Sequence, residues 1–371
     1  MLKSEMRSLI KSGGAAAIHG LRVNRLPVFG KDNRNFPLII GYHRVVQDFE
    51  SASRRSMPSM LVSTAMLEAQ LDWLARHYEL VSLDELRLSG PTQMPRGGRP
   101  QAAITFDDGY ADFYWNAHPL LQRKGIPSAV FVVTSLVGTD GLQVHDELYL
   151  LLAGAFGPAG VCNDDGDVQW LEDTDADGSA TAWLMRTVRE VSDPYSLTRA
   201  VLDRLEYGQV RALLRQLRQR IVLTNEEREE FLSLDWPMLE ELVSRGVTVG
   251  SHSHSHALLS EVPAETVDFE LMNSRALLES RLGVRVSHLA YPDGRFNATV
   301  VRAAESAGYD RAYTICNHRS QVDTRYTLSR KMFWEKSCAD WRGRMSPAIL
   351  SCQVNGLFDP AAACVRKHGV S

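Results

Sequence analysis

The first residues that could do chemistry are two neighbouring carboxylates, Asp107 and Asp108, followed by Gly109. They come directly after the short apolar run 102–106, whose length and composition predict a strand. Successive side chains of a strand point to opposite faces, so the two carboxylates can converge only where the strand ends, and Gly109 gives the chain that freedom. One carboxylate could then bind a metal ion while the other takes a proton from water. A solvated Asp-Asp-Gly turn is the alternative for these residues alone.

The second group is a set of three histidines, His252, His254 and His256, which follow a strand predicted at 247–250. Imidazoles four positions apart can share one metal ion on a helical turn, and alternate residues share one face of a strand. The pair could therefore be His252 with His256, or all three could point one way. Two histidines with one carboxylate form a metal site that leaves positions open for water and a substrate oxygen. A surface His-Ser tract is the alternative, which the preceding strand disfavours.

The segments that must position these residues alternate between short apolar runs and amphipathic stretches. This alternation predicts an α/β domain of βα units around a parallel sheet or barrel, in which chemistry lies at the carboxyl ends of the strands. Further strands are predicted at 37–42, 128–133, 286–291 and 312–315, and helices at 66–78, 111–124, 237–245, 264–282 and 298–307.

One region, from about residue 154 to 232, breaks this rhythm with a polar acidic loop and helical stretches at 182–191 and 195–221. We interpret it as a helical insertion in the α/β domain or a lid over it. The second stretch is rich in arginine, for which a solvated helix face is the simpler interpretation and contact with an anionic glycan or a lipid phosphate the alternative. Its arginines are Arg199, Arg204, Arg211, Arg215, Arg218 and Arg220.

The composition is that of an ordinary globular protein, with 44% hydrophobic and 23% charged residues among 371. A formal net charge of −4 argues against a dedicated nucleic-acid-binding protein. No run reaches the roughly 18 apolar residues that a membrane span needs. The five cysteines form no CxxC pair, which favours reduced thiols in a cytosolic protein.

The N-terminal segment 1–35 contains seven Lys and Arg residues but only a short apolar run at 15–18. This pattern lacks the core of a signal peptide, so we expect a cytoplasmic protein. The basic segment could touch the cytoplasmic face of an anionic membrane, and a solvated terminus is the simpler alternative.

Three motifs in this order resemble those of the polysaccharide deacetylase family, also known as carbohydrate esterase family 4 or NodB-homology domains. They are TFDDG at 105–109, the H-[ST]-x-x-H pattern from His252 to His256, and AYPDG at 290–294. The YHRV stretch at 42–45 and the Leu-Ser-Arg stretch at 328–330 resemble further elements of the branch that carries YHxV and AYPxG. The resemblance covers most of 37–333 outside the insertion.

The resemblance implies a distorted (β/α) barrel that uses a divalent metal, usually zinc, to remove N-acetyl groups from amino-sugar polymers. Carried over by position, Asp107 is expected to be the general base, and the backbone N–H of Tyr110 the oxyanion donor. The expected metal ligands are Asp108, His252 and His256, and the expected substrate-binding residues are Tyr291, Pro292 and Arg330.

Two positions depart from the family pattern. Ala290 stands where the third motif often has an arginine that orients the base, and Arg330 is our candidate substitute. The late motif with the histidine that serves as general acid is missing, and His43, at the end of the first predicted strand, is our candidate. The alternative for Arg330 is an arginine on a surface strand, and the alternative for His43 is a buried structural histidine.

The sequence therefore predicts three parts: a basic segment at 1–35, a deacetylase barrel at 36–333 with a helical insertion at about 154–232, and an extension at 334–371. The expected function is metal-dependent deacetylation of an N-acetylated glycan, such as an exopolysaccharide intermediate. The alternatives are an O-acetyl esterase or other N-acyl deacylase, and a glycan-binding protein without turnover.

Overall fold

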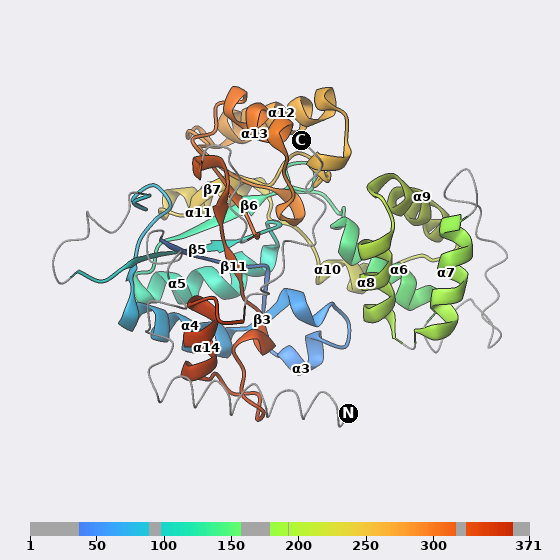
Figure 1. The fold of residues 1–371 in the computed structure, drawn as a ribbon, viewed down its shortest axis with the longest axis horizontal. Helices are drawn as coiled ribbons and strands as arrows, with labels where there is room; N and C mark the ends of the chain where they lie inside the picture. Colours follow the sequence, from blue (N-terminus) through green and yellow to red (C-terminus); the bar gives the residue numbers. More distant parts are fainter. Residues whose placement is uncertain (1–36, 89–97, 157–178, 192, 317–323, 359–371) are drawn as a thin grey trace.

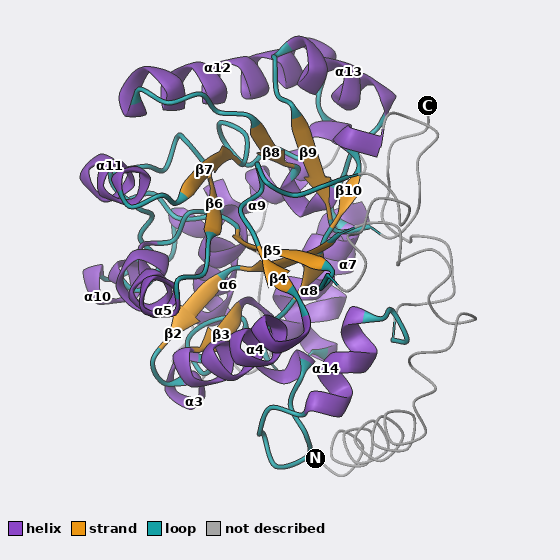
Figure 2. Ribbon diagram, turned by 90° about the vertical axis from the view of Figure 1, so that its left-hand side faces the viewer, coloured by secondary structure: helices purple, strands orange, loops and turns teal. Residues whose placement is uncertain are grey.

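The parallel strands of the protein follow one another around a nearly closed barrel, in the order β10-β9-β8-β7-β6-β5-β1-β11. The structure is a computed structural model that describes residues 37–358, apart from 89–97, 157–178, 192 and 317–323. The expected α/β barrel is confirmed, with the strands at the centre and helices around them (Figure 2). The strands are β1 (Leu38–Tyr42), β5 (Gln101–Phe106), β6 (Ser128–Val132), β7 (Thr248–Ser251), β8 (His288–Ala290), β9 (Arg311–Thr314), β10 (Leu328–Ser329) and β11 (Lys331–Met332).

The barrel closes at a single residue. β10 and β11 stand at opposite ends of the strand order, yet only Arg330 separates them along the chain. β10 pairs with β9, and β11 pairs with β1. Arg330 therefore lies at the seam where the last strand segment crosses to the first.

The strands are nearly continuous apolar runs because both of their faces are covered, as in other parallel sheets. The helices α4, α5, α11, α12 and α13 surround the barrel, and the short β4 (Glu79–Leu80) pairs with β5 (Figure 2). The helices are α4 (Thr64–His77), α5 (His118–Lys124), α11 (Trp236–Ser244), α12 (Ala264–Leu282) and α13 (Ala298–Ser306). The helix predicted at 111–124 is split, since a π-helical turn (Phe113–Ala117) precedes α5.

A helical lobe lies beside the barrel, between β6 and β7 in the sequence (Figure 1). It begins at Val144 rather than near residue 154, and it has an apolar core of its own. The stretch predicted as one helix at 195–221 is two helices, because Leu205 is extended and Glu206 caps the next helix. The lobe consists of α6 (Val144–Phe156), α7 (Ser179–Glu190), α8 (Pro194–Arg204), α9 (Tyr207–Arg218) and α10 (Asn225–Glu229).

The remaining elements are short. A second parallel pair, β2 (Arg44–Val46) with β3 (Leu61–Ser63), carries α3 (Phe49–Ala52) between its strands. After β11, the chain forms a 3-10 turn (Glu335–Ser337) and α14 (Pro347–Val354), a part that the sequence pattern did not place. Further 3-10 turns are Pro58–Met60, Leu259–Glu261, Pro292–Gly294 and Thr324–Tyr326. The predicted basic segment 1–35 lies outside the described residues.

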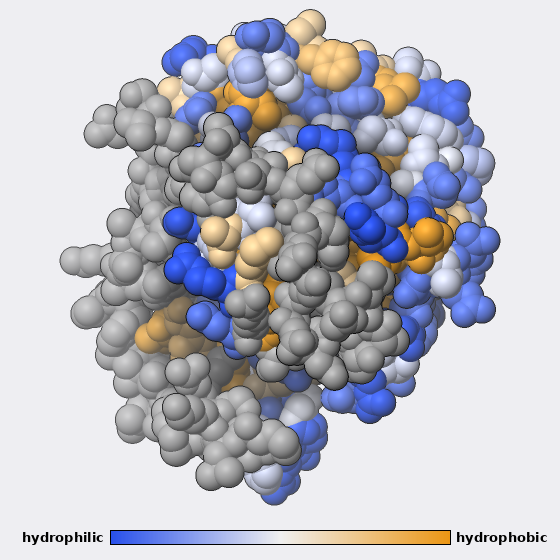
Figure 3. Space-filling view, turned by 90° about the vertical axis from the view of Figure 1, so that its right-hand side faces the viewer, coloured by the Kyte–Doolittle hydropathy of each residue, from blue (hydrophilic) through white to orange (hydrophobic). Residues whose placement is uncertain are grey.

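The surface on the side of the lobe is mostly hydrophilic where it is described, with apolar side chains in small groups (Figure 3). Among the described helices, none combines the length and the apolar character that a bilayer crossing requires.

Candidate metal centre and active site

The two carboxylates lie at the carboxyl end of β5, where the chain leaves the barrel. The Asp107 N–H donates to Tyr42 O (2.8 Å), which continues the ladder between β5 and β1 by one residue. Asp108 and Gly109 then take left-handed conformations, with φ of 69° and 67°. A Cβ at Gly109 would come within 2.8 Å of Val132 Cγ1, so only glycine fits here. This sharp turn brings both carboxylates to the same end of the barrel, as the sequence predicted.

The histidine loop follows β7 at the same end of the barrel. The His252 N–H donates to Val132 O (2.9 Å), and His256 has a positive φ of 57°. The loop is held by the buried carboxylate of Glu270 on α12, which accepts from the backbone N–H groups of His254 (2.8 Å) and Ser255 (2.7 Å). The conformation of the loop therefore depends on a long-range contact that the local sequence does not reveal.

The loop separates the three histidines. His252 and His256 point toward Asp108, whereas the His254 ring bonds Thr134 Oγ1 through Nδ1 (2.9 Å) and meets Phe269 edge to face. Of the two pairings that the sequence left open, the structure brings together His252 with His256.

Asp108, His252 and His256 form a group that could hold a metal ion, since one ligand atom from each lies within 4.8 Å of the others. Asp108 Oδ1 is 3.5 Å from His252 Nε2 and 3.4 Å from His256 Nε2. The His252 Nδ1–H donates to Ala290 O (2.8 Å), so its Nε2 presents a lone pair. Lone pairs of nitrogen and carboxylate oxygen thus face one another, an arrangement that a cation stabilises.

The surroundings of these three residues also fit a cation. Neither oxygen of Asp108 has a hydrogen-bond partner among the described residues, although both are buried. Burial raises the pKa of Asp108 well above its ordinary value, because no protein donor compensates the charge. Burial lowers the pKa of both His252 and His256, so they are neutral near pH 7, the form that binds metals.

Arg330 holds Asp107 beside this group. Its Nη1 and Nη2 bond the two Asp107 oxygens at 2.6 and 2.7 Å, and the guanidinium lies over the Phe131 ring. Burial would raise the pKa of Asp107, but the charge and hydrogen bonds of Arg330 bring it below its ordinary value. Arg330 is thus placed to orient Asp107 from the barrel seam, whereas the methyl side chain of Ala290 cannot bond a carboxylate.

Tyr110 presents a backbone N–H at the site. The residues on either side of Tyr110 form backbone hydrogen bonds with the segment before α11. The Ala111 N–H donates to Leu232 O, and Gly109 O accepts from the Leu234 N–H. The Tyr110 N–H therefore points away from that segment, and it has no hydrogen-bond partner among the described residues. This leaves it available to an oxygen of a substrate.

His43 follows β1 at the same end of the barrel and is half-buried. Burial lowers the pKa of His43 to about 4, and the nearby charge of Asp107 acts in the opposite direction. Its imidazole is therefore neutral near pH 7 and lies among the charges of the site.

His145, at the start of α6, is a residue near the metal group that the motifs did not mark. Its Nε2 is 3.8 Å from Asp108 Oδ2 and 2.9 Å from the Tyr110 hydroxyl, which in turn donates to Asp146. The helical lobe thus contributes a side chain to the edge of the site.

Two residues of the third motif, Tyr291 and Pro292, are packed in the protein interior. The Tyr291 ring is fully buried against Phe296, and its hydroxyl donates to Tyr326 O (3.0 Å). Pro292 is buried in the 3-10 turn that follows β8. The geometry gives the Tyr291 side chain a packing role, and substrate contact by Tyr291, Pro292 or Arg330 stays a prediction.

Comparison with known proteins agrees with this site. The family model described as polysaccharide deacetylase matches residues 95–150 and 192–312, which include the Asp107 and His252 motifs. The chain is similar to the poly-beta-1,6-N-acetyl-D-glucosamine N-deacetylases of Escherichia coli (strain K12) and Staphylococcus aureus (strain MSSA476), with 35% identity over 117 residues and 28% over 126. These matches cover 29% and 31% of this chain but only 16% and 42% of the relatives.

Among solved structures, that of IcaB from Ammonifex degensii aligns with 86% of this chain and 97% of its own, at 16% identity and a TM-score of 0.49. The family match spans the strands that carry both the carboxylate pair and the histidine loop. The chain belongs to the polysaccharide deacetylase family.

Proposed function

We propose that the protein is a metal-dependent hydrolase that removes N-acetyl groups from an amino-sugar polysaccharide or oligosaccharide. The observation that carries this proposal is the buried Asp107, held by Arg330 beside a carboxylate–histidine group that fits a metal ion. The similarity to poly-beta-1,6-N-acetyl-D-glucosamine N-deacetylases supports the choice of substrate class.

The ligand set suggests zinc as the metal. Two neutral imidazoles and one carboxylate form a common catalytic zinc set that leaves a position for water or substrate. A divalent metal bound by Asp108, His252 and His256 would polarise the acetamide carbonyl and lower the pKa of water.

The protein's own groups would then carry the proton transfers. Asp107, fixed by Arg330, accepts a proton from the attacking water through lone pairs that the guanidinium leaves free. The free Tyr110 N–H donates to the oxygen on which negative charge develops. His43, neutral near pH 7, can donate to the leaving amine only after a proton reaches it during the reaction, and Asp107 is the candidate source.

The decisive test combines metal analysis with acetate release from N-acetylglucosamine oligomers. We expect one bound divalent metal per chain and acetate release in the wild-type protein. His256→Ala should lose both, because it removes one of three ligands, and His254→Ala should keep both, because that ring faces away from the site. Metal without acetate release would favour an O-acetyl esterase, another deacylase or a binding protein, and absence of metal would refute the proposed site.

His43 gives a separate prediction about the acid step. We expect His43→Gln to lower kcat on N-acetylated oligomers about 100-fold while the metal content stays unchanged. The reason is that an amine must be protonated as it leaves. With 4-nitrophenyl acetate, whose leaving group needs no proton, the loss should shrink to less than about threefold. An equal loss on both substrates would assign His43 a structural role instead.

A further inference from the structure

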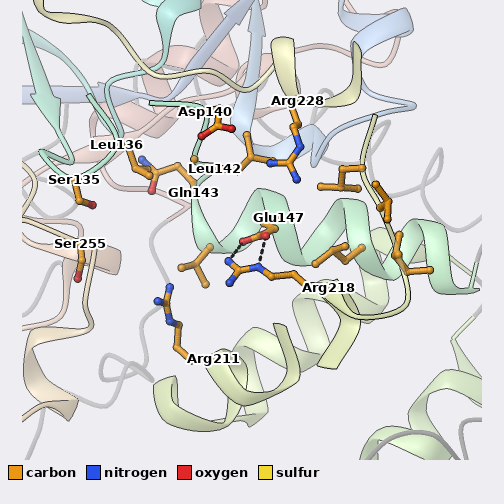
Figure 4. A pocket seen from close by; sticks show the side chains of 16 residues that line it. Ser135, Leu136, Asp140, Leu142, Gln143, Glu147, Arg211, Arg218, Arg228 and Ser255 are labelled. Carbon is orange, nitrogen blue, oxygen red and sulfur yellow. Dashed lines mark hydrogen bonds and ion pairs between the residues drawn. The ribbon is translucent and has the colours of Figure 1, made fainter. Parts of the chain in front are cut away.

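A pocket of about 490 Å³ lies between the barrel and the helical lobe (Figure 4). One wall comes from barrel loops and includes Ser135, Gln143 and Ser255. The other comes from the lobe, with Arg211 and Arg218 of α9, residues 221–223, and Arg228 of α10. The pocket therefore exists only because the family barrel carries this insertion, and its size falls in the range of small-ligand sites.

Three arginines line the pocket, and they differ in whether a carboxylate forms an ion pair with them. Arg218 is neutralised by a bidentate ion pair with Glu147, in which both N···O distances are 2.6 Å. Arg211 and Arg228 form no ion pair with a described residue, and they reach into the pocket from opposite sides (Figure 4). Asp140 is the other carboxylate in the lining, so the pocket keeps a surplus of about one positive charge.

The pocket borders the candidate metal centre. Gln143, in its wall, donates through Nε2 to Asp108 O (3.0 Å). Ser255, in the same wall, precedes the ligand His256 along the chain. A chain of sugar units with one unit at the metal centre could thus place a neighbouring unit in the pocket.

We propose that this pocket is a subsite for a carboxylate-bearing sugar, such as a uronic acid residue, in the same glycan that is deacetylated. Guanidinium groups bond carboxylates in a planar, bidentate way, and one surplus positive charge matches a monoanion better than a phosphate dianion. The serines and Gln143 offer partners for sugar hydroxyls, and Leu136 and Leu142 offer apolar contact. The proposal rests on the proposed function for taking a glycan as the ligand.

Calorimetry on the full chain tests the subsite without turnover, with trigalacturonate, N-acetylglucosamine trimer and inorganic phosphate as probes. We expect trigalacturonate to bind at least about tenfold more tightly than the other two, and more weakly as salt increases. The double variant Arg211→Gln with Arg228→Gln should lose at least about tenfold of that affinity. Arg215→Gln is the matched control, because Arg215 is exposed on the same helix but does not line the pocket.

Three results would overturn the subsite: no binding of trigalacturonate, equal binding of the neutral trimer, or affinity that the double variant leaves unchanged. Tighter binding of phosphate would overturn the choice of a carboxylate. Acetate release from N-acetylglucosamine oligomers is measured separately. Binding of trigalacturonate that the double variant weakens, in a protein that releases no acetate, would keep the subsite while refuting the deacetylase.

Discussion

Replacing Asp107 with Asn is expected to reduce acetate release about 1000-fold while the protein keeps its bound metal. The amide has almost the same shape but cannot take a proton from water. Asp107 is not one of the three metal-binding residues, and its oxygens face Arg330 rather than the two histidines. Metal analysis of the folded variant and acetate release from N-acetylglucosamine oligomers measure the two effects separately.

The neighbouring carboxylate provides the matched comparison. Asp108→Asn makes the same chemical change one residue later, where both side-chain oxygens are buried and unpartnered among the described residues. We expect this variant to lose the metal together with the activity. If Asp107→Asn lost its metal to the same extent, Asp107 would be a ligand, and the division of roles between the two carboxylates would be wrong.

Much of the barrel could be predicted because its strands are short apolar runs bounded by turns. The strand predicted at 102–106 and the carboxylates after it lie where the pattern put them, at Gln101–Phe106 and Asp107. The strands that close the barrel could not be found in this way. β10 and β11 have two residues each, too few to show a period, and they exist only because β9 and β1 offer edges to pair with.

Within the site, local sequence predicted the groups that follow strands but not the contacts that other parts of the chain make with them. Glu270 fixes the histidine loop from the middle of a long helix, and His145 comes from the helical lobe. Neither stands in a motif, because their roles depend on tertiary contacts. The direction of the Tyr291 side chain could not be predicted from the sequence either, since the face to which it points depends on where β8 ends.

Removing Arg330 is expected to destabilise the fold and to change how the site responds to pH. Arg330→Gln leaves the buried Asp107 without its countercharge at the barrel seam, and breaking such a pair costs about 3–5 kcal/mol in the free energy of unfolding. Burial then acts on Asp107 without the opposing arginine, so its pKa should rise above the ordinary value. The acidic limb of the activity profile should accordingly move to higher pH.

The sign of the stability change with pH follows from the same pair. In the wild-type protein the pKa of Asp107 is below its ordinary value of about 4, so the pair stabilises the fold above that pH and loses its effect as the pH falls through the lowered pKa. In Arg330→Gln the raised pKa reverses this, and the fold is favoured where Asp107 is protonated. The difference in Tm between the two proteins should therefore be largest near pH 7 and shrink in acid.

Two further variants make this prediction sharp. Arg330→Lys keeps the charge but not the planar fork, so we expect it to restore part of the stability and little of the activity, because Asp107 would no longer be held by two hydrogen bonds. Arg344→Gln breaks an exposed pair with Asp340 and should change the free energy of unfolding by less than about 1 kcal/mol. If Arg330→Gln matched Arg344→Gln in stability and kept the wild-type pH profile, the seam arginine would not be the residue that positions the base.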